Sequence, residues 1–301
     1  MALATSGCAN VQHSVSANQN SRVSIIVIHH TTSNFADSYN VLVNPTSRPV
    51  SSHYLIPEPG DPTYGKSKLK VYQLVDETRR AWHAGVSHWG GKEGINDQSI
   101  GIELVNQTWC HASEQSKDPE TGYPERICFY PDFDDGQLAL LTKLLGEILE
   151  RHPDVKPTHI VGHSDVAPDR KIDPGPRFPW ERLAKLGYGA WFDDETVIRY
   201  WEQFLKEPLP LINVQKALEA YGYGIEPNGE DDEHSRNVLR AFQLHFRPYR
   251  VNREADVETT AILFALIEKY YPEQLEALLL VEEPPMPGDE MEAAPATEAT
   301  P

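Results

Sequence analysis

Two histidines lie at the ends of short apolar runs of the sequence, and an aspartate follows the second histidine in a loop. His29 closes the run that starts at Ile25, and His163 directly follows a second run. Asp173 comes ten residues after His163, in a loop that contains two prolines. Two imidazole nitrogens and one carboxylate oxygen suit Zn²⁺, and three protein ligands leave a fourth position for water, as in catalytic zinc sites. The sequence has 12 histidines, so spacing alone leaves open that these are surface or hydrogen-bonded histidines without a metal.

Glu103 stands between Ile102 and Leu104 in an apolar segment. A carboxylate there either faces solvent on one side of a sheet or is kept there for a purpose. Its apolar neighbours should raise its pKa. His30 should point away from His29, because side chains alternate along a strand.

Three β-branched runs are predicted to be the strands that position these residues: 21–30, 99–105 and 158–161. Residues 135–150 are predicted to form an amphipathic helix that ends before Pro153. Its apolar face comprises Leu138, Leu141, Leu145 and Ile148. Strands that alternate with helices predict an α/β fold with a mixed central β-sheet flanked by helices.

The chain of 301 residues is long enough for two domains. A break at residues 206–210 separates a predicted catalytic domain, 21–206, from a small three-helix domain, 207–281. The helical domain has three apolar patterns, one of them preceded by Asp256 as a plausible N-cap, and its aromatic residues are expected to be mostly core. These aromatic residues are Tyr221, Phe242 and Phe246. Residues 1–20 are predicted to be a flexible lead-in, and the acidic, Pro-rich residues 282–301 to be disordered.

Composition excludes several classes of protein. The net charge of −18 argues against a nucleic-acid-binding protein, which presents basic faces to phosphate. The sequence contains no apolar run near the roughly 18 residues that a membrane-spanning helix needs. It also contains no Gly-rich phosphate loop, no Gly-x-Ser-x-Gly motif and no His-Glu-x-x-His motif, so an unrelated zinc protease is the least favoured class of enzyme.

Four ordered motifs resemble the zinc-dependent N-acetylmuramoyl-L-alanine amidases of the amidase-2 family, which are related to animal peptidoglycan-recognition proteins. The motifs span residues 25–31, 81–85, 99–104 and 162–175. The resemblance implies that His29, His163 and Asp173 are zinc ligands. It also implies that Glu103 is the catalytic acid and base and that Lys171 is the basic residue near the metal. Trp82 and His83 either line the substrate site or serve in core packing and hydrogen bonding. The other histidines, His30, His53 and His159, are expected to be structural, because the ligand positions are filled.

The segments 213–223 and 240–243 are similar to a three-helix peptidoglycan-binding module. Residues 3–8 resemble the end of a bacterial lipoprotein signal, with Cys8 as the lipidated residue, although Thr5 is unusual there and a basic and a long apolar region are missing. Together these features resemble the outer-membrane lipoprotein type of the family. They imply a periplasmic location in the bacterial cell envelope, with membrane contact only through a lipid anchor. Cys110 and Cys128 could form a disulfide in an exported protein or remain free thiols in a cytosolic one.

The resemblance implies hydrolysis of the amide between N-acetylmuramic acid, including its 1,6-anhydro form, and L-alanine of the stem peptide. Zn²⁺ is the expected cofactor, and peptidoglycan and muropeptides are the expected partners. One alternative is a protein that binds peptidoglycan without cutting it, but such relatives typically lack a metal ligand. Another is a cytosolic recycling amidase, which the appended helical domain and Cys8 argue against. The sequence does not predict an oligomeric state.

Overall fold

The computed structural model describes residues 21–117 and 124–281, together with residues 12, 14 and 16–19. The predictions for Cys8, for most of the lead-in and for the acidic tail at 282–301 therefore lie outside the described residues. No helix in the described part of the chain combines the length and apolar character needed to cross a membrane.

A five-stranded mixed sheet forms the centre of the molecule, in the order β3-β2-β6-β1-β9. The strands are β1 (Ile25–His30), β2 (Tyr54–Ile56), β3 (Tyr72–Gln73), β6 (Ser99–Leu104) and β9 (Ile160–Gly162). β1 runs parallel to both β6 and β9, and β2 runs parallel to β6, whereas β3 is antiparallel to β2. The predicted mixed sheet is thus confirmed.

Two of the predicted strands begin later than expected. β1 begins at Ile25 rather than at residue 21, and β9 begins at Ile160 rather than at residue 158. The residues before β9 form a 3₁₀ turn, η2 (Pro157–His159), with Pro157 at its first position. A proline there has no N–H to give to a strand ladder and has φ already suited to a helical turn, which accounts for the difference.

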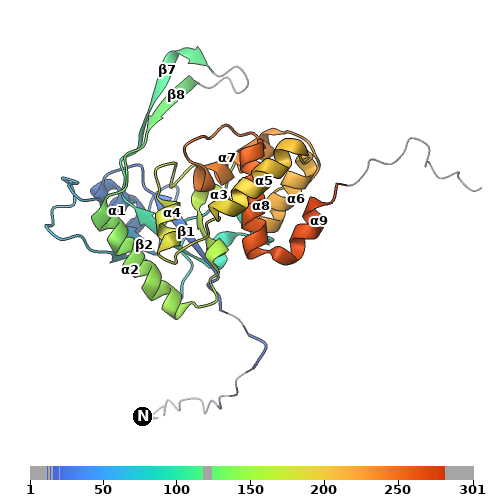
Figure 1. The fold of residues 1–301 in the computed structure, drawn as a ribbon. Helices are drawn as coiled ribbons and strands as arrows, with labels where there is room; N and C mark the ends of the chain where they lie inside the picture. The colour runs from blue at the N-terminus through green and yellow to red at the C-terminus, as the bar shows by residue number, and fades with distance from the viewer. Residues whose placement is uncertain (1–11, 13, 15, 20, 118–123, 282–301) are drawn as a thin grey trace, which may run out of the picture.

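The two faces of β1 pack against different layers. Ile26 and Ile28 point into a core shared with α2 (Asp135–Arg151), whose predicted apolar face is buried. Ile25 and Val27 point the other way, into a core shared with the C-terminal helices. This alternation follows from the two-residue period of a strand. Figure 1 shows α2 and the C-terminal helices on opposite sides of the sheet.

The C-terminal layer contains the three predicted helices, which are α6 (Leu211–Tyr221), α7 (Glu233–Phe246) and α8 (Val257–Tyr270), and α9 (Leu275–Leu279) follows them. Asp256 caps α8 as predicted, because its side chain accepts a hydrogen bond from the Thr259 N–H. α5 (Asp194–Lys206) precedes the predicted domain boundary, yet its Tyr200 and Phe204 pack against Phe264 of α8. By packing, therefore, the helical layer starts before residue 207.

The helical layer is joined to the sheet by a continuous apolar core. Trp89 of the short hairpin β4 (His88–Trp89) and β5 (Lys92–Glu93) stands edge-on to Tyr221 and Tyr223. The Trp89 indole N–H also donates to the Thr158 carbonyl. The helices are therefore packed onto the part of the chain that forms the central sheet.

A second hairpin projects from the molecule, with strands β7 (Trp109–Lys117) and β8 (Pro124–Phe129) (Figure 1). Cys110 and Cys128 lie opposite each other in this hairpin and form a disulfide, which decides between the two alternatives left by the sequence. Trp109 stacks on Phe129 with ring centroids 4.4 Å apart, and both side chains are exposed. The remaining helices are α1 (Phe35–Val43), η1 (Ile95–Asp97), α3 (His163–Val166), α4 (Trp180–Lys185) and η3 (Pro272–Gln274).

Candidate active site

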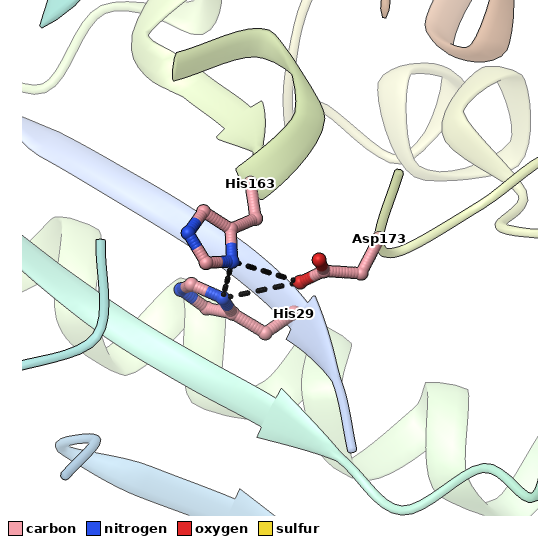
Figure 2. A group of neighbouring side chains, drawn as sticks. All are labelled: His29, His163 and Asp173. Carbon is pink, nitrogen blue, oxygen red and sulfur yellow. Dashed lines mark hydrogen bonds and ion pairs between the residues drawn. The ribbon is translucent and has the colours of Figure 1, made fainter. Parts of the chain in front are cut away.

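The structure brings together the three predicted metal ligands at one edge of the sheet (Figure 2). His29 lies near the end of β1, and His163 opens α3 directly after β9. Because β1 and β9 are parallel neighbours, their carboxyl ends meet at the same edge, where open α/β sheets place their ligand sites. The His29 Nδ1 and His163 Nδ1 atoms are 2.9 Å apart. The Asp173 Oδ2 atom lies 3.3 Å from the former and 3.1 Å from the latter.

The donor set fits zinc. Tetrahedral zinc with bonds of about 2.0–2.1 Å separates its ligand atoms by roughly 3.3 Å, close to the observed spacing. Among the described residues, this is the one group of three His, Cys, Asp or Glu side chains whose ligand atoms converge in this way. His29 and His163 are buried, so the two rings are held in place.

The charge states of these side chains also suit metal binding. Burial, reinforced by His163, lowers the pKa of His29 to about 4, so this imidazole is neutral near neutral pH. Burial disfavours ionisation of Asp173, but the charge and hydrogen bonds of His163 and His29 outweigh it and hold the Asp173 pKa well below its usual range. Neutral imidazole and ionised carboxylate are the forms that bind a metal ion.

The outer nitrogens of both ligand rings are hydrogen-bonded, which fixes their orientation. His163 Nε2 lies 3.3 Å from the Ala84 carbonyl oxygen, to which it donates when Nδ1 is the ligand. His29 Nε2 lies 3.0 Å from His83 Nδ1. His83 Nε2 lies 3.0 Å from Ser99 Oγ, which itself donates to the Ile95 carbonyl. When His29 Nδ1 carries no hydrogen, every donor in this series of hydrogen bonds has an acceptor. The series ends at the backbone carbonyl oxygen of Ile95.

Trp82 and His83 both line the cavity beside the ligands, but they differ in exposure. Trp82 is 49% exposed, whereas His83 is 8% exposed and lies between His29 and Ser99. The contacts of His83 thus fit both of its alternative roles, hydrogen bonding and a place in the wall of the site. The peptide nitrogens of His83 and Ala84 both donate to Asn96 Oδ1, which anchors this segment.

Gly101 of β6 leaves space for the His83 ring. A Cβ at this position would lie 2.5 Å from His83 Cγ. We expect Gly101→Ala to displace the ring, to lower the free energy of unfolding by about 1–3 kcal/mol as overpacking does, and to weaken metal binding. Thermal unfolding and metal titration measure the two effects. Ile100→Val in the same strand is the control, and equal metal affinity in the Gly101→Ala variant and in wild type would contradict the account.

Glu103 lies on β6 directly opposite His29 of β1. Burial, together with the negative charge of Asp173, raises its pKa to about 8, and the positive charge of Lys171 acts in the opposite direction. Its Oε2 atom has no hydrogen-bond partner within the described part of the chain. A buried carboxylate oxygen without a partner is costly, and such perturbed groups concentrate at functional sites.

A cavity of about 280 Å³ adjoins the ligands and brings the predicted residues together. Its wall combines polar and apolar side chains, which include Thr31, Thr32, Val41, Val50, Trp82, Glu103, Lys171 and Asp173. A larger cavity of about 770 Å³ lies along α2, but its partly buried acid, Glu77, already forms hydrogen bonds with Tyr54, Arg151 and His152. The smaller cavity therefore carries the candidate chemistry.

His30 lies in a different environment from His53, although both were expected to be structural. His30 is 6% exposed and lines the cavity, and neither ring nitrogen has a partner among the residues that the structure describes. By contrast, His53 accepts from the Gly101 N–H and approaches the Arg79 carbonyl, as a structural histidine does. The signal available in the sequence was the position of His30 at the end of the strand that carries the first ligand.

Comparisons with known proteins agree with this geometry. The family model described as N-acetylmuramoyl-L-alanine amidase matches residues 19–176. N-acetylmuramoyl-L-alanine amidase AmiD of Escherichia coli is 40% identical over 250 residues, covering 83% of this chain and 84% of that protein.

Two solved structures are similar over most of the chain. AmpDh3 from Pseudomonas aeruginosa, in complex with anhydromuramic pentapeptide, has a TM-score of 0.77 and 40% identity, covering 88% of this chain and 98% of that chain. AmiD from E. coli, in complex with the substrate anhydro-N-acetylmuramic acid-L-Ala-D-gamma-Glu-L-Lys, has a TM-score of 0.70 and 38% identity, covering 85% and 93%. The chain belongs to the N-acetylmuramoyl-L-alanine amidase family.

Proposed function

We propose that this protein is a zinc-dependent amidase that hydrolyses the bond between N-acetylmuramic acid, including its 1,6-anhydro form, and L-alanine of the stem peptide. The observation that carries the proposal is the convergence of His29, His163 and Asp173 beside a cavity that also holds Glu103. The substrate class is supported by the two similar structures, both of which contain anhydromuramyl peptides.

In this mechanism His29, His163 and Asp173 hold the metal. A zinc ion held by these residues would supply two effects, a lowering of the pKa of water from 15.7 to about 7 and polarisation of the carbonyl oxygen of the scissile amide. Glu103 accepts the proton of the attacking water and returns a proton to the nitrogen of the departing L-alanine. The Lys171 ammonium, which lines the same cavity, stabilises the negative charge that develops on the carbonyl oxygen.

Trp82 is proposed to form a wall for the substrate. Its side chain is half exposed at the cavity, near the apolar Val41 and Val50. An indole ring offers a large apolar surface at the edge of a polar site, which suits the sugar ring and lactyl group of the substrate.

The pH dependence of the reaction should report on Glu103. The general base must be ionised, so kcat/KM should rise with pH through an acidic limb whose midpoint lies between the ordinary value of 4.5 and about 8. Lys171→Met should move this midpoint upward, because Lys171 lowers the pKa of Glu103. Initial rates on a defined muropeptide across the pH range provide the measurement. A midpoint below the ordinary value, or a downward shift in the variant, would argue against this base.

The proposed reaction is tested by mass spectrometry of muropeptides and sacculi after incubation with the purified protein, with and without a chelator. We expect free stem peptide and peptide-free glycan, lost with the chelator and restored by zinc. If the protein sediments with sacculi but cuts neither substrate, the peptidoglycan-binding alternative replaces the proposal. Activity on anhydro muropeptides alone would favour a recycling amidase.

We further propose that the protein acts in the periplasm, anchored to the outer membrane through lipidated Cys8, and that its C-terminal helices bind peptidoglycan. The support for the anchor is the sequence of residues 3–8. The disulfide between Cys110 and Cys128 accords with an oxidising compartment. Labelling of cells with radioactive palmitate tests the anchor, and Cys8→Ser should remove both the label and membrane association.

A further inference from the structure

A buried carboxylate connects the helical layer with the helix that carries a metal ligand. Asp165 lies in α3, two residues after His163, and is 1% exposed. Its Oδ1 atom accepts from the Tyr223 hydroxyl at 2.7 Å. Its Oδ2 atom accepts from His245 Nδ1 at 2.8 Å and from the Gly162 N–H at 2.7 Å. Two of the three donors therefore come from the helical layer.

The two donors from the helical layer are themselves held rigidly. The His245 ring is stacked between Trp180 and Phe246, with centroid distances of 3.9 Å and 4.1 Å. The Tyr223 ring stands edge-on to Trp89 at 4.9 Å. Because stacked and interlocked rings have few alternative rotamers, the positions of these donors are set by the packing of the helical layer.

α3 in turn connects two of the three metal ligands. Its first residue is His163, and the Ser164 N–H donates to the Asp173 carbonyl at 2.8 Å. A change in the orientation of α3 therefore moves His163 and Asp173 together. The side chain of Asp165 accepts three short hydrogen bonds, two of them from the helical layer, so these bonds are well placed to fix that orientation.

We propose that the helical layer is a working part of the metal site, with Tyr223 and His245 as positioning residues that act through Asp165. This inference rests on the proposed zinc chemistry, and it goes beyond a wall-binding role for the helices. Loss of either donor should leave the fold and peptidoglycan binding in place while weakening metal binding and lowering kcat.

The experiment compares full-length variants that remove one donor and keep the ring. Tyr223→Phe removes only the hydroxyl, and His245→Phe keeps a ring between Trp180 and Phe246. His245→Asn restores an N–H donor near the position of Nδ1. Tyr200→Phe is the matched control, because the buried Tyr200 hydroxyl donates to the carboxylate of Glu268 at 2.6 Å within the helical layer and does not contact Asp165.

The readouts are the zinc dissociation constant from competition with a chromophoric chelator, the melting temperature, and kcat and KM on a defined muropeptide. We expect Tyr223→Phe and His245→Phe each to raise the zinc dissociation constant by about 10–100-fold, as loss of groups that orient ligands does. The effect should fall on kcat more than on KM. His245→Asn should recover much of the loss, and Tyr200→Phe should bind zinc like wild type even where its melting temperature falls.

The outcomes separate this inference from the proposed function. The positioning role is overturned by the following result. Wild type binds zinc and cleaves muropeptide, and at a similar loss of melting temperature both donor variants bind zinc and cleave as well as Tyr200→Phe does. If wild type itself neither binds zinc nor cleaves, the proposed function has failed, and the inference fails with it.

Discussion

Replacement of Glu103 by glutamine should lower kcat by about 10²–10⁴-fold, the usual contribution of a positioned acid and base. Glutamine keeps the size and polarity of the side chain but cannot accept the proton of the attacking water. Zinc content should stay at the wild-type level, because Glu103 is outside the ligand group. Steady-state rates on a defined anhydromuramyl tripeptide, together with metal analysis, give the result.

The stability of the metal-free protein provides an independent control for this variant. The pKa of Glu103 is about 8 in the folded protein and 4.5 ordinarily. The folded state therefore binds more protons than the unfolded state between these values, and the contribution of Glu103 to stability is lost as pH rises through this window. Glu103→Gln removes the titration, so its melting temperature relative to wild type should increase from about pH 5 to about pH 8. A variant with near wild-type kcat, or one whose relative melting temperature falls with pH, would contradict the assignment.

Asp173→Asn should have the second large effect, on metal binding itself. The substitution removes the one negative charge of the ligand group and the carboxylate that lies against both histidines. We expect the zinc dissociation constant to rise by at least about 100-fold, since even groups that merely orient ligands contribute about 10–100-fold. Amidase activity at ordinary zinc concentrations should be lost. Competition with a chelator measures the affinity, and rates at increasing zinc measure any recovery.

Asp169→Asn is the matched control for the ligand variant. Asp169 is in the same loop, but it is exposed and bonds to His234 and Asn237 of the helical layer rather than to the ligands. This control variant should retain wild-type zinc affinity. If both variants bind zinc equally well, Asp173 is not a ligand and the proposed metal site is wrong.

His29, His163 and Asp173 were predicted as a group from the resemblance of four motifs, because spacing alone left open that these histidines bind no metal. The structure adds the topological reason why the two histidines converge: His29 lies near the end of β1, His163 directly follows β9, and these strands are parallel neighbours whose ends meet. The same holds for Glu103, which is opposite His29 in β6. The α2 helix and the cap at Asp256 were predictable because periodicity and capping are local properties.

The features that the sequence did not reveal depend on tertiary contacts. The path from His29 through His83 to Ser99 joins residues that come from three separate segments. Helix α5 lies on the catalytic side of a local Pro-rich break, but its aromatic residues pack on α8. The bonds of Asp165 to Tyr223 and His245 span 58 and 80 residues of sequence. Local composition and periodicity carry no information about such pairings.

Hydrolysis in water enriched in the heavy oxygen isotope tests the central claim most directly. The protein would be incubated with an anhydromuramyl tripeptide in this water, and both products would be analysed by mass spectrometry. The account predicts one heavy oxygen atom in the lactyl carboxylate of the muramic acid product, an unlabelled peptide with a free L-alanine amino group, and no reaction when a chelator is present. A labelled peptide fragment would mean that a different bond is cut, and cleavage that persists with the chelator would contradict the metal-dependent mechanism.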